Sequence, residues 1–414
     1  MNLRPNVLLV FSDQESNHLE WSFLKTPFQN KIKREGVIFS RFYTTSPQCS
    51  PARASMLTGL YPSENNVIAN VDKVSTGLPL SKEKTVIAGY FKRCGYNTAY
   101  FGKWHLGNFN RISEFGFDTH EVKEITKDND DIVAHKAASW IINQSETPWF
   151  ACVSFNNPHG IYKINQKPDY PVRDGIDIPI SLSDNLSSKP SPQKQYLEKD
   201  QGETFKDADK LKWKQYRSYY CDLIELVDKC FGTVLAALDK TNSWENTVII
   251  YTSDHGDLAG AHGMPFKGPC MYEELINVPF YIAWRNHLPA GIENQSLASH
   301  VDIVPTVCSL LNIEPDYPST GQDLIGVIQN KNYGKGRVFF EYTAKQQWVN
   351  QIRAVRQGEW KLVHYLNDTD ELYKLSDDPY ELDNLAYDKN YRYLREELLK
   401  LIYEKFNLKN NYTK

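Results

Sequence analysis

Residues 6–14 read NVLLVFSDQ, a continuous apolar run that ends in a polar triplet. A run of this kind predicts a parallel strand buried on both faces that delivers polar groups at its carboxyl end. The pattern returns at residues 97–101, 150–155 and 247–252, each time followed by charged or imidazole side chains. We therefore expect four strands to present these groups at one edge of a sheet, the edge at which open α/β sheets bind ligands.

Apolar side chains from Tyr216 to Leu238 recur at spacings of three and four, which predicts an amphipathic helix between the last two of these strands. Strands that alternate with helices indicate an α/β fold with a large, mostly parallel sheet flanked by helices. Residues 166–209 are rich in Pro, Ser, Lys and Asp, and we expect them to form a surface excursion beside the ligand edge.

The pattern changes near residue 326, where three short strand-like runs begin and lead to a terminal helix at about residues 391–406. We interpret residues 1–325 as the large domain. Residues 326–414 are expected to form a small C-terminal α+β subdomain, with an antiparallel sheet and a helix.

Charge and hydropathy exclude several classes of protein. The 414 residues include 47 Lys and Arg against 51 Asp and Glu, so the net charge of −4 gives no general attraction to nucleic acid or to an anionic membrane. The chain has no apolar run near the roughly 20 residues that span a bilayer, and residues 1–14 lack the features of a signal peptide. These features predict a cytoplasmic protein with no membrane or nucleic-acid partner.

The seven cysteines are widely spread, odd in number and without a C-x-x-C pair. This argues against a disulfide framework and against a cysteine zinc site. Six of them are expected to be small buried side chains. The seventh, Cys49, lies in a motif.

Residues 49–59 read CSPARASMLTG. By itself this segment could be a helix start with a cysteine cap and Pro51 in the first turn. It also resembles the sulfatase signature, C-x-P-x-R with a downstream T-G, whose cysteine is converted after translation to formylglycine. Companion motifs follow in the expected order along nearly the whole chain, which is identified as a member of the formylglycine-dependent type I sulfatases of the alkaline phosphatase superfamily.

The resemblance implies a site for one divalent metal. Asp13, Asp254 and His255 stand after two strands where the family supplies ligands, next to the modified Cys49. Carboxylates suit Ca²⁺ or Mg²⁺, whereas an imidazole shifts the preference towards Mn²⁺ or Zn²⁺; Ca²⁺ is our first choice, with Mg²⁺ or Mn²⁺ as alternatives. Many members carry Asp-Asp after the first strand, and Gln14 occupies the second position here, as in choline-sulfatase-like and phosphonate-hydrolase-like relatives. A ligand role for Gln14 is therefore left open.

Further motifs supply candidate groups for binding the substrate. Residues 102–107, GKWHLG, match the family element G-K-W-H-x-G, and the i, i+2 spacing lets Lys103 and His105 reach one anion. His159 and Lys267 match positions that contact substrate in the family. His262 is open between a substrate contact and support of its loop.

The resemblance also implies a mechanism in which formylglycine hydrates to a gem-diol. One hydroxyl attacks sulfur and expels the alcohol, and deprotonation of the other then releases sulfate. His105 is the expected base for that release. Arg53 and Lys103 would hold the diol and the sulfate oxygens, and His159 or Lys267 would protonate the leaving oxygen.

We therefore expect a sulfuric ester hydrolase that acts on the sulfate monoester of a small molecule or an oligosaccharide, with a carbohydrate sulfate as first choice. Its expected protein partner is a formylglycine-generating or anaerobic sulfatase-maturating enzyme. A phosphonate monoester or phosphodiester hydrolase of the same superfamily is one alternative. A non-catalytic protein that binds sulfated ligands and keeps Cys49 as a thiol is the other.

Overall fold

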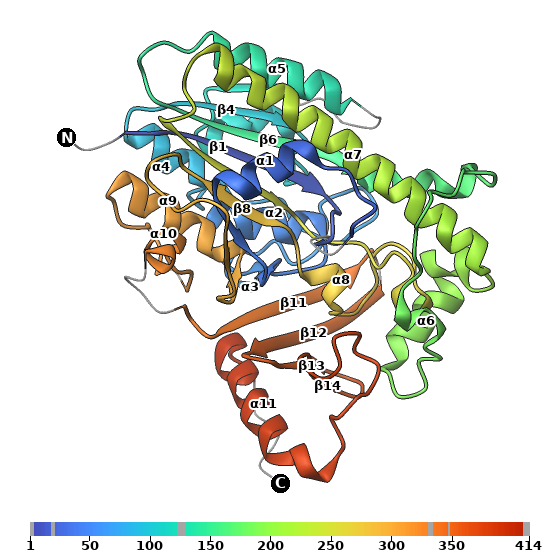
Figure 1. Cartoon of the computed structure of the whole chain (residues 1–414). Helices are drawn as coiled ribbons and strands as arrows, with labels where there is room; N and C mark the ends of the chain where they lie inside the picture. Colours follow the sequence, from blue (N-terminus) through green and yellow to red (C-terminus); the bar gives the residue numbers. More distant parts are fainter. Residues whose placement is uncertain are drawn as a thin grey trace.

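The computed structural model describes residues 4–17, 21–121, 129–318, 320–329, 334–346 and 348–408. Its largest sheet has eight strands in the order β5-β4-β6-β1-β7-β8-β2-β9 (Figure 1). These strands are β1 (Asn6–Asp13), β2 (Val37–Phe39), β4 (Asn97–Gly102), β5 (Thr119–Glu121), β6 (Trp149–Pro158), β7 (Thr247–Ser253), β8 (Phe280–Ala283) and β9 (Ile292–Asn294). Among them, only the two pairings made by β8 are antiparallel, so the predicted mostly parallel sheet is confirmed.

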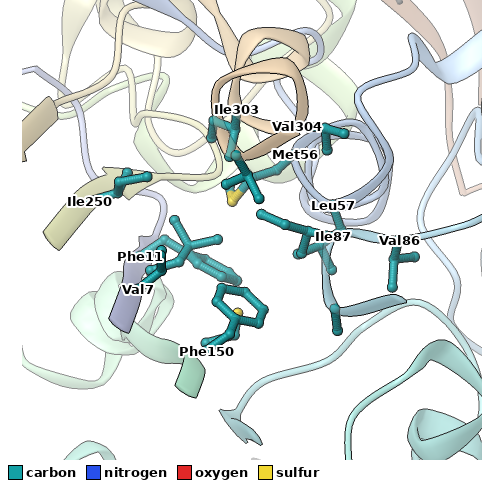
Figure 2. Close-up of a cluster of buried hydrophobic side chains, with 14 of the residues drawn as sticks. Val7, Phe11, Met56, Leu57, Val86, Ile87, Phe150, Ile250, Ile303 and Val304 are labelled. Carbon is teal, nitrogen blue, oxygen red and sulfur yellow. The ribbon is translucent and has the colours of Figure 1, made fainter. Parts of the chain in front are cut away.

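The central strand β1 is buried on both faces, as its apolar run predicts. Val7, Leu9 and Phe11 project to one face, where Figure 2 shows Val7 and Phe11 in a cluster with side chains of neighbouring strands and helices. Leu8 and Val10 project to the other face. A polar side chain at either set of positions would be buried in apolar surroundings, so the register of β1 is fixed by burial.

Helices cover both faces of this sheet. The helices α2 (Cys49–Thr58), α4 (Ile87–Arg93), α9 (Ile303–Leu311) and α10 (Leu324–Ile328) contribute to the cluster on the Val7 face. The opposite face carries α1 (Pro27–Glu35), α5 (Asp130–Ile142) and α7 (Lys210–Lys240), with α5 and α7 side by side in Figure 1. The amphipathic helix predicted at Tyr216–Leu238 lies within α7.

The C-terminal part is an antiparallel sheet of β11 (Arg337–Lys345), β12 (Trp348–Gln357), β13 (Trp360–Tyr365) and β14 (Glu371–Lys374). Helix α11 (Arg392–Phe406) packs on one face of this sheet. The other face shares a core with the large domain through side chains such as Tyr43 and Tyr272. The expected small α+β subdomain is confirmed, whereas the division at residue 325 stays a prediction, because α10 spans it and packs on α9.

The excursion predicted at residues 166–209 bridges two parts of the molecule. Ile176 and Phe205 pack against side chains of α7. From the same excursion, α6 (Ser191–Lys199) lies beside the C-terminal sheet (Figure 1), and the Gln193 amide donates to Glu371 at 3.1 Å. The remaining short elements are α3 (Pro62–Asn65), α8 (Glu273–Ile276) and the paired strands β3 (Phe42–Tyr43) and β10 (Ala298–Ser299).

All seven cysteines are free thiols, and no disulfide framework exists. Cys94 is half-buried rather than buried, because it closes the exposed end of α4; the other six are buried. Within the described ranges, none of the helices combines the length and the apolar character needed to cross a membrane.

Candidate active site

The first turn of α2 begins at Cys49 and is tied to two loops through Ser50. The Ser50 hydroxyl donates to the carbonyl of His105 at 2.6 Å and accepts from the backbone N–H of Val71 at 3.0 Å. At the other end of α2, Gly59 has φ 72°, and a Cβ there would lie 2.9 Å from Val304 Cβ. The motif residues therefore fix both ends of the helix that carries Cys49.

Arg53, one turn further along α2, is fully buried between the carboxyl ends of β1 and β7. Its guanidinium binds Asp13 Oδ2 at 2.7 Å and Asp254 Oδ2 at 2.8 Å. It also donates to the carbonyl of Lys103 at 2.7 Å and to Ser154 Oγ at 2.8 Å. Burial disfavours the guanidinium charge, but the two carboxylates outweigh it and raise the pKa of Arg53. Arg53 thus holds two carboxylates in place, and its predicted contact with sulfate stays a prediction.

Each of these carboxylates keeps one oxygen towards Cys49 or His255. Asp13 Oδ1 is 3.7 Å from Cys49 Sγ, and Asp254 Oδ1 is 3.7 Å from His255 Nε2. Burial opposes ionisation of Asp13, but the charges of Lys103 and Arg53 hold its pKa well below the usual range; the Lys103 ammonium lies 2.6 Å from Oδ2. Burial and the neighbouring charge of Asp13 raise the pKa of Asp254. A divalent cation between the two would relieve that repulsion.

His255 directs a nitrogen lone pair towards the space between the Asp13 and Asp254 carboxylates. Its Nδ1 lies 2.9 Å from the carbonyl oxygen of Gly256, so Nδ1 is the protonated donor and Nε2 carries the lone pair. Nε2 faces Cys49 Sγ at 3.3 Å and Lys267 Nζ at 3.0 Å. One ligand atom each from Asp13, Cys49, Asp254 and His255 lies within 4.8 Å of the others. Four of the five predicted metal-site residues are thus brought together.

Gln14, the fifth, is fully buried and has φ 77°. Its Nε2 donates to Asp257 Oδ2 at 2.6 Å, which turns the amide so that Oε1 has no hydrogen-bond partner in the described part of the chain. A buried amide oxygen without a partner is costly unless something else binds it, and an oxygen suits a hard cation. Sequence reasoning missed Asp257, although it stands three residues after Asp254 in the stretch DHGD.

The Cys49 sulfur lies 2.9 Å from the Lys267 ammonium. Burial and Asp13 oppose ionisation of the thiol, but the charges of Lys267 and Lys103 hold the pKa of Cys49 well below its usual value. Position 49 therefore favours negative charge.

A cavity of about 810 Å³ opens over this cluster. Its lining includes the predicted substrate-site residues Cys49, Lys103, His105, His159 and Lys267. His105 Nδ1 is buried and has no hydrogen-bond partner among the described residues, so it is available to a ligand. Burial, reinforced by the Lys103 charge, lowers the pKa of His159, which keeps that imidazole neutral.

His262 does not line this cavity. Its ring is buried, stacks on Tyr272 with centroids 3.6 Å apart, and places Nδ1 2.7 Å from Asp184 Oδ2. Of the two alternatives for His262, these contacts favour support of the loop.

Residues that no motif singled out also line the cavity, among them Gln201 from the excursion, Lys345 at the end of β11 and Gln346 just after it. The amide of Gln48, next to Cys49, donates to the carbonyl of Ala344 at 2.8 Å and links α2 to β11. Long-range packing creates this wall, and local sequence patterns gave no signal for it.

A family model described as Sulfatase matches residues 5–313, about three quarters of the chain that carries this cluster. The chain belongs to the sulfatase family. It is a sulfuric ester hydrolase of the alkaline phosphatase superfamily. A second model, described as the C-terminal part of N-sulphoglucosamine sulphohydrolase, matches residues 260–407.

Sulfatases from several organisms are similar to the chain over most of its length. It is 27% identical to a choline-sulfatase of Rhizobium meliloti, over 92% of this chain and 82% of that protein. It is 25% identical to an N-acetylglucosamine-6-O-sulfatase of Bacteroides thetaiotaomicron, over 97% and 86%. A solved 2-O GAG sulfatase superposes with a TM-score of 0.86 at 25% identity, covering 98% and 93%. The phosphonate monoester hydrolase of Agrobacterium radiobacter shares the fold, with a TM-score of 0.82 at 23% identity, covering 97% and 96%.

Proposed function

We propose that this sulfatase hydrolyses the sulfate monoester of a saccharide, with Cys49 converted to formylglycine and a divalent cation beside it. The observation that carries the proposal is the convergence of Asp13, Asp254 and His255 on Cys49, which lines a basic cavity. The alternative of a phosphonate or phosphodiester hydrolase offers the same tetrahedral oxygens to this site, so substrate assays must separate the two.

The donor set fits a divalent cation. Asp13 and Asp254 would hold it through carboxylate oxygens, His255 through Nε2, and the unpartnered Oε1 of Gln14 adds a further oxygen. Mostly oxygen donors favour Ca²⁺, with Mg²⁺ or Mn²⁺ as alternatives. The cation would polarise the nucleophile and neutralise charge on the sulfate.

Formylglycine at position 49 fits the same surroundings. Once hydrated it supplies two hydroxyls, one to attack sulfur and one whose deprotonation releases sulfate. Lys267 and Lys103 stand where they stabilise negative charge on the attacking group and on the sulfate oxygens. Cys49 is only 1% exposed, so we propose that a formylglycine-generating or anaerobic sulfatase-maturating enzyme acts on the chain before it folds.

Two histidines on the cavity wall complete the proposed chemistry. His105, with an unpartnered Nδ1, takes the proton whose loss releases sulfate. The proposed proton donor to the leaving alcohol oxygen is His159 or Lys267, since both line the cavity, and the lowered pKa of His159 favours Lys267. Arg53 acts by fixing Asp13 and Asp254.

The cavity favours an anionic substrate. Its lining includes five lysines against one aspartate: Lys73, Lys103, Lys163, Lys267, Lys345 and Asp72. A saccharide is the proposed alcohol part because similar proteins include an N-acetylglucosamine-6-O-sulfatase and a Delta 4,5-hexuronate-2-O-sulfatase.

Two measurements test the proposal. Intact mass of protein matured in cells should be lower by about 18 Da than the sequence mass, the change from cysteine to formylglycine. The matured, metal-loaded enzyme should hydrolyse saccharide sulfates faster than choline sulfate, an aryl sulfate or an aryl phosphonate. A faster aryl phosphonate reaction would transfer the assignment to the phosphonate hydrolases.

A further inference from the structure

A second cavity, of about 570 Å³, adjoins the cavity over Cys49, and Lys345 and Gln346 line both. We propose that this second cavity binds the sugar residue that neighbours the sulfated one, so that the preferred substrate is at least a disaccharide. The inference rests on the proposed function and specifies its substrate.

The hairpin of β11 and β12 forms one wall of the second cavity. Lys345 and Trp348 are directly paired across the two strands, so their side chains lie side by side on one face of the sheet. Trp348 is half-buried and packs its ring against the core shared by the two parts of the chain. The hairpin thus presents an anchored indole next to an ammonium group.

The opposite wall comes from α6 and the residue that follows it. Gln195, Lys199 and Asp200 line this side. Asp200 Oδ2 lies 2.9 Å from Lys345 Nζ, so an ion pair joins the two walls. The side chains of Lys345 and Asp200 are 12% and 25% exposed, so the pair is partly desolvated and still open to a ligand.

These groups match the chemistry of a pyranose ring. The ion pair offers both N–H donors and carboxylate acceptors to hydroxyl groups, and the Gln346 amide offers one more of each. The Trp348 indole offers a flat apolar surface to the C–H face of the ring. A purely apolar group would leave the ion pair unsatisfied.

The position of the second cavity also suits a residue joined to the sulfated one. Lys345 is close enough to Lys267, at the catalytic cluster, for the Lys267 charge to disfavour protonation of Lys345. The Gln48 amide, which binds the Ala344 carbonyl, ties the hairpin directly to the start of α2. This hydrogen bond from a side chain to the backbone links the walls of the two cavities.

The test compares a sulfated monosaccharide with a disaccharide that carries the same sulfated residue. N-acetylglucosamine 6-sulfate and a 2-sulfated hexuronate serve as monosaccharides, and 4-nitrocatechol sulfate is the reference ester. We expect kcat/KM for the disaccharide to exceed that for its monosaccharide by about tenfold in the wild type. Trp348→Ala should lower this ratio by about tenfold, and Trp348→Phe should restore most of it, because a phenyl ring keeps the apolar face.

Two further variants show whether a change in the disaccharide-to-monosaccharide ratio reflects binding rather than misfolding. Gln346→Gly removes the amide at a position whose φ of 53° glycine favours, and should lower the ratio by about threefold. Tyr393→Ala removes an 80% exposed ring on α11, outside both cavities, and should leave the ratio at its wild-type value.

The inference is overturned if mono- and disaccharides are hydrolysed with equal efficiency, or if Trp348→Ala and Gln346→Gly leave the ratio unchanged. A matured enzyme that cleaves 4-nitrocatechol sulfate but no saccharide sulfate, or no sulfate ester at all, overturns the proposed function itself and the inference with it, so the two failures are distinct.

Discussion

The carboxyl edge of the large sheet and the β11–β12 hairpin border the same cavity but are built differently. At the sheet edge, Asp13, Arg53 and Asp254 are fully buried, and each charge has a partner within 3 Å. At the hairpin, Gln346 is exposed and the ion pair of Lys345 is partly open to water. Under the proposed function, buried networks fix the reacting groups, whereas a partly open surface recognises the rest of the substrate.

The strongest test of the sheet edge is Cys49→Ala. It should abolish turnover of every sulfate ester, because alanine cannot become formylglycine, while the fold is kept, because the change only removes one sulfur atom from a buried position. Steady-state assays and thermal unfolding measure the two effects. Turnover above a few per cent of the wild-type rate would contradict a nucleophile at position 49.

A second test separates residues that bind the proposed cation directly from residues that only contact those ligands. Asp254→Asn should lower metal occupancy and kcat/KM by about a hundredfold or more, because it removes a carboxylate from the proposed cation. The matched control, Asp257→Asn, changes a buried carboxylate that contacts the Gln14 amide and the Tyr216 hydroxyl. It should weaken metal binding by about tenfold only. Elemental analysis of both variants decides, and full occupancy in Asp254→Asn would remove that residue from the ligand set.

The same contrast explains what the sequence predicts and what it does not. Asp13, Lys103 and Asp254 each follow a continuous apolar strand, and parallel strands bring their carboxyl ends to one edge, so their meeting follows from local patterns. No local pattern marks Lys345, because it reaches the site only when the C-terminal sheet packs on the large domain.

His262, whose role the sequence leaves open, shows the reverse situation. Its place in a loop after β7 resembles that of a substrate contact, but tertiary packing pairs it with Asp184, 78 residues earlier in the chain. The sequence also does not predict that Gln14 Oε1 lacks a partner in the described part of the chain, because this depends on the hydrogen bond from the Gln14 amide to Asp257. Sequence patterns therefore indicated which residues reach the sheet edge, and side-chain partners decide what each residue does there.

A third test asks which step His105 serves. His105→Ala should lower kcat by about a hundredfold and slow the release of sulfate more than the attack, because the imidazole is proposed to take the proton from the spare hydroxyl. Rapid mixing should then show a burst of alcohol. Intact mass should show a sulfated form, about 80 Da above the hydrated aldehyde.

Lys103→Ala is the comparison for that experiment. It removes a positive charge that binds Asp13 and faces the cavity, so it should depress the attack itself and trap no adduct. Loss of rate in His105→Ala without a burst or an adduct would place the histidine at the attack step instead.

The smallest expected effect concerns stability at the hairpin. Burial lowers the pKa of Lys345 to about 8, whereas an unfolded chain holds this proton up to about pH 10.4. Between pH 8 and 10 the unfolded state therefore binds more protons, and the stability of the wild type rises with pH; below pH 8 both states are protonated and the cost of the buried charge is constant.

Lys345→Met removes this cost, so it should stabilise the protein at pH 7 by on the order of 1–3 kcal/mol, and the gain should shrink as the pH approaches 10. Urea unfolding at pH 7 and pH 9.5 measures both values. A variant less stable than the wild type at pH 7 would show that the ion pair with Asp200 stabilises the fold. The expected gain would show that the hairpin keeps a charged side chain at the expense of stability, as is common for groups that recognise a ligand.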